Sequence, residues 1–407
     1  MISFFNRATR CLLLAAFLGF SLFSLSAAEF IPVGTLALGG GASSFEGDES
    51  SKGLDLNATF VPALKFSDKT SLLPGLYVTY FGAKSVQELI GGGTLYQDEL
   101  SANLNLRLIK KIRPDFKLKY KAGYKLDYLR ETKDEDWGDG LFDYNKWTAG
   151  AEAEWKNIKK IDTMQLAFDY YTVSFPNYST LAESAFGKEV STDAAVSPGK
   201  SVLDFSAAEI FHRSDILLEQ NLLLSYTVAF NLKNFPEQKI IKSDGSFGAD
   251  KRSDLKLDLS ALYSRYLPDQ KFSWGIKSSF ASNSSSQNHY DAERYQYISS
   301  YYDYSEFKIG PVISKKINSV DLDANLLLGS KTYSGRLTQD AQGNYLSSKV
   351  GNTLTLISLA GHYPVSKEIK AHLLYNWYKQ SSNMKYEQVY RYNFTTSNIM
   401  LNFSCDF

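Results

Sequence analysis

The stretch that decides the fold is residues 116–127, which read FKLKYKAGYKLD. Apolar and aromatic side chains occupy the even positions, whereas lysine occupies positions 117, 119, 121 and 125 of the odd set. A β-strand places successive side chains on opposite faces, so this stretch predicts a strand with one apolar and one basic face. A helix would mix the two sets on each face, because its repeat is 3.6 residues.

The same alternation continues outward along most of the chain, as at 54–65, 147–155, 255–263, 320–328 and 399–407. We count about sixteen strand candidates, with fourteen or eighteen as alternatives. Short turns are expected at 67–70, 113–115, 157–162, 212–215, 267–270, 315–319 and 364–368. Long loops are expected at 46–53, 82–96, 131–146, 176–200, 234–253, 282–300, 333–350 and 379–391. This alternation predicts an all-β, up-and-down antiparallel sheet with its long loops at one end.

Composition excludes several classes of protein. The mean hydropathy of −0.25 and the single long apolar run, near the N-terminus, exclude a polytopic helical membrane protein. The 44 basic and 44 acidic residues cancel, so nothing favours nucleic-acid binding. Two cysteines cannot make a disulfide-rich scaffold or a four-thiolate zinc site.

The first residues are typical of a cleaved secretory signal peptide. Arg7 and Arg10 precede an apolar stretch, and small residues at 26–28 offer a cleavage site before Glu29. We therefore expect residues 1–28 to be removed and residues 29–407 to form one barrel domain. The remaining chain would keep one cysteine, Cys405, and no internal disulfide.

A sheet of this width must close, because an open sheet would need a cover and no helical pattern is available to supply one. Side chains cannot fill a barrel of this size, so the polar set should line a wet lumen and the apolar set should face lipid. Trp147 and Trp155 bracket an alanine stripe and are expected at the two membrane interfaces. The candidate lumen residues are Arg107, Lys117, Lys119, Lys121, Lys125, Glu152, Glu154, Asp321, Asp323, Lys370 and His372.

The charges of this set are uneven although they nearly balance overall. Arg107 and the lysines of 116–126 would make a basic wall, which Glu152 and Glu154 face from the next strand. Two interpretations remain open: the pairs neutralise each other across strands, or the lysines form a path for anions.

The whole pattern resembles a Gram-negative outer-membrane β-barrel of porin type. In that class a terminal aromatic residue, with apolar residues at alternate positions before it, is read by the barrel-insertion machinery. Leu401, Phe403 and Phe407 match that signal. The resemblance implies the cell outer membrane as location, both termini in the periplasm, and outer-membrane lipid, the insertion machinery and small hydrophilic solutes as partners. The long inward-folding third loop of classical porins is not evident, since the longest loop expected here is 176–200.

No residue pattern indicates catalysis. His212 is expected at a short turn and His372 inside the lumen, and no nucleophile motif or zinc-ligand spacing accompanies the histidines. Six acidic residues between 131 and 143 depart from the spacing of a calcium loop and are expected to be solvated. We therefore expect no enzyme, metal or cofactor.

The sequence leaves two functions open. The first is a water-filled pore for passive diffusion of small hydrophilic solutes. The second is a non-transport surface or assembly-associated barrel that acts through its outer loops, for which the tyrosine-rich loop 282–304 is the candidate.

Overall fold

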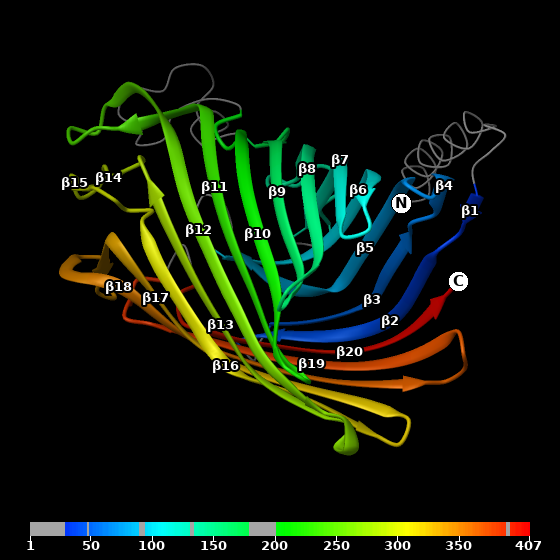
Figure 1. The fold of residues 1–407 in the computed structure, drawn as a ribbon. Helices are drawn as coiled ribbons and strands as arrows, with labels where there is room; N and C mark the ends of the chain where they lie inside the picture. The colour runs from blue at the N-terminus through cyan, green and yellow to red at the C-terminus, as the bar shows by residue number, and fades with distance from the viewer. Residues whose placement is uncertain (1–28, 47–48, 89–93, 131–133, 179–200, 388–390) are drawn as a thin grey trace.

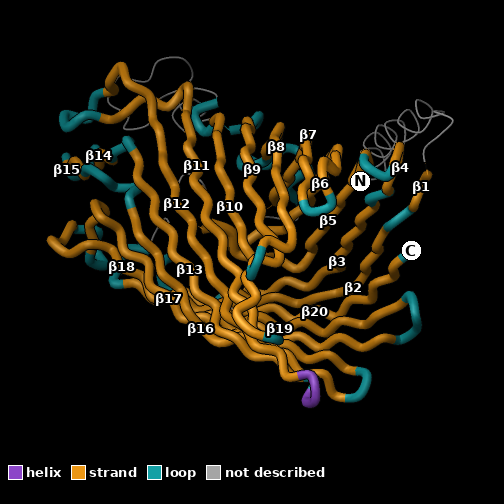
Figure 2. The backbone as a smooth tube through the Cα atoms, viewed as in Figure 1, coloured by secondary structure: helices purple, strands orange, loops and turns teal. Residues whose placement is uncertain are grey.

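The computed structural model describes residues 29–46, 49–88, 94–130, 134–178, 201–387 and 391–407. The expected signal peptide at 1–28 lies outside the described residues. Within them, no helix is long or apolar enough to cross a membrane. Among the described residues, the one helical element is the 3-10 turn η1 (Pro268–Gln270), drawn purple in Figure 2.

Sixteen long antiparallel strands close into a barrel in the described part of the chain, as Figure 1 shows. Each pairs with the strands before and after it in the sequence, and β2 pairs with β20 to complete the ring. The strands are β2 (Gly34–Phe45), β3 (Glu49–Phe60), β5 (Thr70–Glu88), β6 (Thr94–Arg113), β7 (Phe116–Arg130), β8 (Tyr144–Ile158), β9 (Ile161–Ser174), β10 (Phe205–Glu219), β11 (Leu222–Ile241), β12 (Phe247–Leu267), β13 (Phe272–Ser285), β16 (Tyr304–Ile317), β17 (Val320–Gln339), β18 (Tyr345–Pro364), β19 (Ile369–Ser382) and β20 (Phe394–Asp406). The all-β barrel predicted from the sequence is confirmed.

Four shorter strands complete the described sheet structure. β1 (Glu29–Ile31) pairs with β4 (Ala63–Ser67), which continues the line of β3 beside β5. β14 (His289–Asp291) and β15 (Gln296–Ile298) form a separate hairpin between β13 and β16.

The two faces of the sheet show where lipid and water lie. Large apolar side chains are exposed on the outside, with Phe168 at 51% and Leu401 at 48%, whereas charged side chains of the other face are covered, with Glu154 at 7% and Asp127 at 1%. A protein in water would have the reverse distribution. The exposed apolar belt around a closed sheet is the surface of a membrane-spanning barrel.

The barrel has two different ends, which we call the turn end and the loop end. At the turn end, strands connect through two to four residues, as between β10 and β11, where Asn221 adopts a left-handed conformation with φ of 65°. The loop end carries the other connections, most of them longer, together with the β14–β15 hairpin.

Several expected loops are in fact strand. β5, β6, β11, β12, β17 and β18 are 19 to 21 residues long and extend through most of 82–96, 234–253 and 333–350. The extensions begin at register shifts after Phe81, Asn234 and Thr332. These segments were wrongly predicted because β-bulges interrupt the period of two that the sequence argument needs. The expected long loop 46–53 also shrinks, to three residues between β2 and β3.

The prediction of a turn at 212–215 is also wrong. β10 runs through this polar stretch and ends only at Glu219. Arg213 and Asp215 pair with each other on one face, with nitrogen and oxygen 3.2 Å apart, while His212 and Ser214 contact each other on the opposite face. The polar groups of the stretch satisfy one another, so the strand can continue.

Candidate functional site: the inner wall of the barrel

The lysines of β7 lie in ion pairs with acidic residues of the next two strands and of β7 itself. Lys119 Nζ is 2.6 Å from Glu152 Oε1 and 2.5 Å from Glu154 Oε2, both on β8. Lys117 Nζ lies 3.7 Å from the other oxygen of Glu154, and Lys125 Nζ lies 2.5 Å from Asp127 Oδ2. The four lysines are therefore not a bare positive wall.

Lys121 reaches one strand further than the others. Its Nζ is 2.7 Å from Asp169 Oδ2 on β9, and Gly150 of β8 lies between them in the register. A Cβ atom on Gly150 would lie 1.8 Å from Asp169 Oδ1. The missing side chain leaves the gap that Asp169 and the ammonium group of Lys121 occupy.

Arg107 is placed differently from the lysines. It lies on β6 opposite Lys121, between Leu73 and Lys121 in the register, and its side chain is exposed. Arg107 is thus the accessible cation of the predicted basic set, and Lys121 beside it is held by Asp169.

The remaining polar candidates gather at the turn end, on β17 to β20. Asp321 lies 3.4 Å from Lys316 Nζ, and Lys370 Nζ lies 2.8 Å from Asp406 Oδ2. Asp323 accepts a hydrogen bond from Ser314 and lies beside His362. The same region contains His372, so the structure brings together residues more than eighty positions apart in the sequence.

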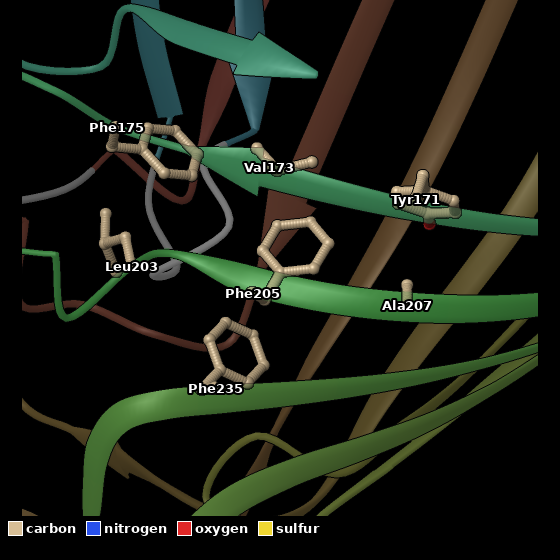
Figure 3. Close-up of a cluster of buried hydrophobic side chains, with 7 residues drawn as sticks. All are labelled: Tyr171, Val173, Phe175, Leu203, Phe205, Ala207 and Phe235. Atoms are coloured by element: carbon tan, nitrogen blue, oxygen red, sulfur yellow. The ribbon is translucent and has the colours of Figure 1, made fainter. Parts of the chain in front are cut away.

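The loop end of the inner wall is aromatic, which the sequence argument missed. Tyr171 and Phe175 lie on and just after β9, Phe205 begins β10, and Phe235 lies on the extension of β11. Figure 3 shows the ring of Phe205 facing that of Phe235, with centroids 5.3 Å apart. These rings occupy inward-facing positions, which hold mostly polar residues elsewhere in the same strands. Alternation along the sequence places them on the lumen side but does not indicate that they cluster.

Two arginines lie between aromatic rings at this end. Arg252 is 3% exposed, forms two hydrogen bonds to Asp254, and lies 4.5 Å from the centroid of Phe235 and 4.6 Å from that of Tyr302. Arg336 lies between Tyr301 and Tyr333, at 4.2 and 4.1 Å. Cations over ring faces are attracted to them. The loop end of the wall is therefore bordered by cations packed against aromatic rings.

The proposed interface residues lie on the outer face. Trp147 is 63% exposed near the loop end of β8, with its ring 4.2 Å from Tyr124, and Trp155 stacks on Phe116 near the turn end at 5.0 Å. Their separation of eight residues corresponds to about 26 Å along a strand.

The terminal residues have a structural role at the closing seam. Leu401 and Phe403 are exposed on the outer face of β20. Phe407 forms two backbone hydrogen bonds with Gly34, at 2.7 and 2.9 Å. Its ring lies where a side chain on Gly34 would be, 2.5 Å from the position of a Cβ atom. Phe407 thus joins the end of the chain to the first long strand.

His212 lies on the outer face, with Ser214 Oγ 3.0 Å and Tyr226 Oη 3.3 Å from its Nε2. A serine beside a histidine is the first requirement of a hydrolase. β10 is paired on both sides here, so its backbone N–H groups are engaged in the ladders and cannot stabilise an oxyanion. We interpret the cluster as polar side chains that satisfy each other on a lipid-facing surface.

In comparisons with known proteins, the chain is similar in fold to solved outer-membrane proteins. No family model and no curated protein matches the chain. Among solved structures, OmpT of Vibrio cholerae, an outer membrane protein in its in-vitro folded trimer form, is 9% identical with a TM-score of 0.48, over 94% of this chain and 100% of that one. An anion-selective porin from Comamonas acidovorans is 10% identical with a TM-score of 0.45, over 93% and 100%. OccD3 of Pseudomonas aeruginosa is 8% identical with a TM-score of 0.45, over 92% and 91%.

Scores this low carry no argument about function. The strand pairing and the exposed apolar belt show a membrane-spanning, up-and-down β-barrel.

Proposed function

We propose that the protein is a water-filled outer-membrane pore through which small hydrophilic solutes diffuse passively. The observation that carries the proposal is the inner wall, where charged side chains are present on most strands and are held in pairs such as Lys119 with Glu152 and Lys308 with Glu306. Paired charges keep a lumen wet while they leave little net field to select ions. The arrangement favours solutes that are excluded by size more than by charge.

Orientation belongs to the same proposal. With the turn end in the periplasm, both ends of the described chain, Glu29 and Phe407, lie on the periplasmic side (Figure 1). An epitope tag in the β11–β12 connection at 242–246 is then expected to be labelled on intact cells, whereas a tag in the β18–β19 turn at 365–368 is not. Equal labelling of the two would refute this orientation.

Conductance in a planar bilayer tests the pore directly. The purified, refolded protein is expected to give stable channel openings whose size grows with salt concentration. A folded barrel that inserts but stays electrically silent would refute the pore and leave the second candidate.

The second candidate is a barrel that acts through its loops. The observation in its favour is the ordered β14–β15 hairpin, where Asp291 accepts a hydrogen bond from Tyr345 of β18 at 3.0 Å and Tyr295 is 83% exposed. An anchored hairpin with an exposed aromatic side chain offers a contact surface for a sugar or a protein. The expectation that the chain is not an enzyme stays a prediction under both candidates.

A further inference from the structure

Two histidines face each other across neighbouring strands near the turn end of the inner wall. His362 of β18 lies directly opposite His372 of β19 in the register. Their Nδ1 atoms are 2.7 Å apart, and the ring planes meet at 67°. Both side chains are partly exposed, so the pair is accessible from the lumen.

The outer nitrogens of the pair have fixed partners. His362 Nε2 lies 3.3 Å from Asp323 Oδ2, and His372 Nε2 lies 2.7 Å from Ser404 Oγ. An ionised carboxylate accepts hydrogen bonds and does not donate them, so Asp323 favours the tautomer of His362 that has its hydrogen on Nε2 and a lone pair on Nδ1. The Ser404 hydroxyl can donate or accept, which leaves His372 free to adopt either tautomer.

The inner nitrogens can therefore bind a cation. When Ser404 accepts, both Nδ1 atoms present lone pairs toward each other, and a cation between them is needed to stabilise that arrangement. Metal–imidazole bonds are about 2.0–2.1 Å long, so the two nitrogens need to separate by only roughly half an ångström to hold one ion. Rotation of two partly exposed side chains is sufficient for such a change.

The surroundings favour a positive ion. The charged groups near the pair are three carboxylates, Asp321, Asp323 and Asp406, and two ammonium groups, Lys316 and Lys370. A recess of about 300 Å³ adjoins Asp323, the neighbour of His362, and has room for water; Lys277 and Ala360 also line it.

We propose that His362 and His372 form a two-imidazole site for a divalent cation that prefers nitrogen ligands, such as Zn²⁺ or Cu²⁺. Asp323 is a positioning residue: it holds the second nitrogen of His362, as carboxylates commonly do for metal-bound histidines. No cluster of three or more ligand side chains occurs among the residues that the structure describes. Water completes the coordination of the ion, which suits reversible binding. Binding goes beyond the proposed pore function and does not require that the barrel conduct.

Calorimetric titration of the refolded full-length barrel with Zn²⁺ tests the site. His362→Asn and His372→Asn are each expected to weaken binding by at least about tenfold, and Asp323→Asn by about tenfold, because it removes only the supporting contact. His212→Asn is the matched control: it changes a histidine of the same barrel on the outer face, and binding should not change. Mg²⁺ should not bind, because it prefers oxygen ligands.

Electron paramagnetic resonance of bound Cu²⁺ gives a second, structural readout. The wild type should show coupling to two imidazole nitrogens and each single variant coupling to one. The proposal is overturned if folded wild type binds Zn²⁺ no better than the double variant that carries both His362→Asn and His372→Asn, or if His212→Asn loses binding equally. Zn²⁺ should reduce the current of the wild type but not of the double variant. A silent barrel that still binds Zn²⁺ through both histidines would refute the pore and leave the site intact.

Discussion

At the scale of single residues, a glycine decides which strands an ion pair can join. Lys121 reaches Asp169 because Gly150 leaves a gap between them in the register. Any side chain at this position would meet both the carboxylate and the backbone of β9, since Phe168 O would lie 2.7 Å from the new Cβ atom.

Gly150→Val is therefore expected to destabilise the barrel by about 1–3 kcal/mol, the usual cost of overpacking. Reversible urea unfolding in lipid vesicles measures the free energy of unfolding. Gly351→Ala is the control, because nothing lies within 4 Å of its added Cβ atom. Equal stability of the two variants would show that Lys121 and Asp169 move apart without cost.

A second residue-scale prediction concerns the connection between β7 and β8. Asp143 accepts hydrogen bonds from the N–H groups of Leu129 at 2.8 Å and Gly140 at 3.1 Å, and burial raises the pKa of its carboxyl from 3.8 to about 6. The folded loop binds the proton more tightly than the unfolded loop. Its stability therefore falls as the pH rises from about 4 to 6, and stays at the lower level above that range.

Hydrogen exchange of the peptide covering 134–143, corrected for the intrinsic rate, measures this stability. Protection is expected to be greater at pH 5 than at pH 7 in the wild type. Asp143→Asn should remove the difference, while Asp134→Asn, whose side chain is exposed, should keep it. Protection that rises with pH would contradict the assigned role of burial.

At the scale of elements, the strand that closes the barrel depends on its last residue in two separable ways. The backbone of Phe407 makes both hydrogen bonds to Gly34, and its ring covers the same glycine. These contacts give Phe407 a structural role in addition to its expected recognition by the insertion machinery.

Two variants separate these roles. Phe407→Ala keeps the backbone hydrogen bonds and is expected to lower the free energy of unfolding by at most about 1.5–3 kcal/mol, because apolar contact is lost. Deletion of Phe407 removes the bonds as well. If the aromatic ring is the recognised signal, both variants should reduce membrane-integrated protein sharply in cells, while Phe407→Ala still refolds in vitro. Normal surface amounts of Phe407→Ala would refute recognition of the ring.

At the scale of the whole molecule, the pairing of positive and negative side chains in the lumen is expected to keep ion selectivity weak. Removal of the positive side chains should make the pore select for cations. Replacement of Lys117, Lys119, Lys121 and Lys125 by glutamine removes the cationic partners of Glu152, Asp169 and Asp127 and leaves Glu154 with Lys156 alone. The lumen then becomes more negative on this side.

The reversal potential of the quadruple variant should shift toward cations, most strongly at low salt. Screening extends over about 30 Å at 10 mM salt but only about 8 Å at physiological salt. Lys110→Gln is the control, because Lys110 lies on the opposite face of β6, beside Leu118 in the register. A reversal potential that does not move at low salt would place these side chains off the conducting path.

Alternation along the sequence was sufficient to predict the closed sheet and the face of each regular strand, because period two follows from backbone geometry alone. It was not sufficient beyond the register shifts after Phe81, Asn234 and Thr332; at the last two, five residues of one strand oppose two of the next, so the inner and outer positions exchange. The contact between His362 and His372 also depends on the register of β18 with β19, which alternation does not determine. Arg252 and Arg336 were missed because their aromatic partners come from several strands and loops.

The seam between β2 and β20 has a consequence for how the barrel assembles. The two strands are separated by nearly the whole chain, so their pairing carries the largest loop-closure entropy of any contact in the sheet. Gly39, Gly40 and Gly41 of β2 provide no side chains that distinguish one alignment from the next. A slip by one residue would turn Leu401 and Phe403 into the lumen, and the bonds between Gly34 and Phe407 act as the stop that prevents it.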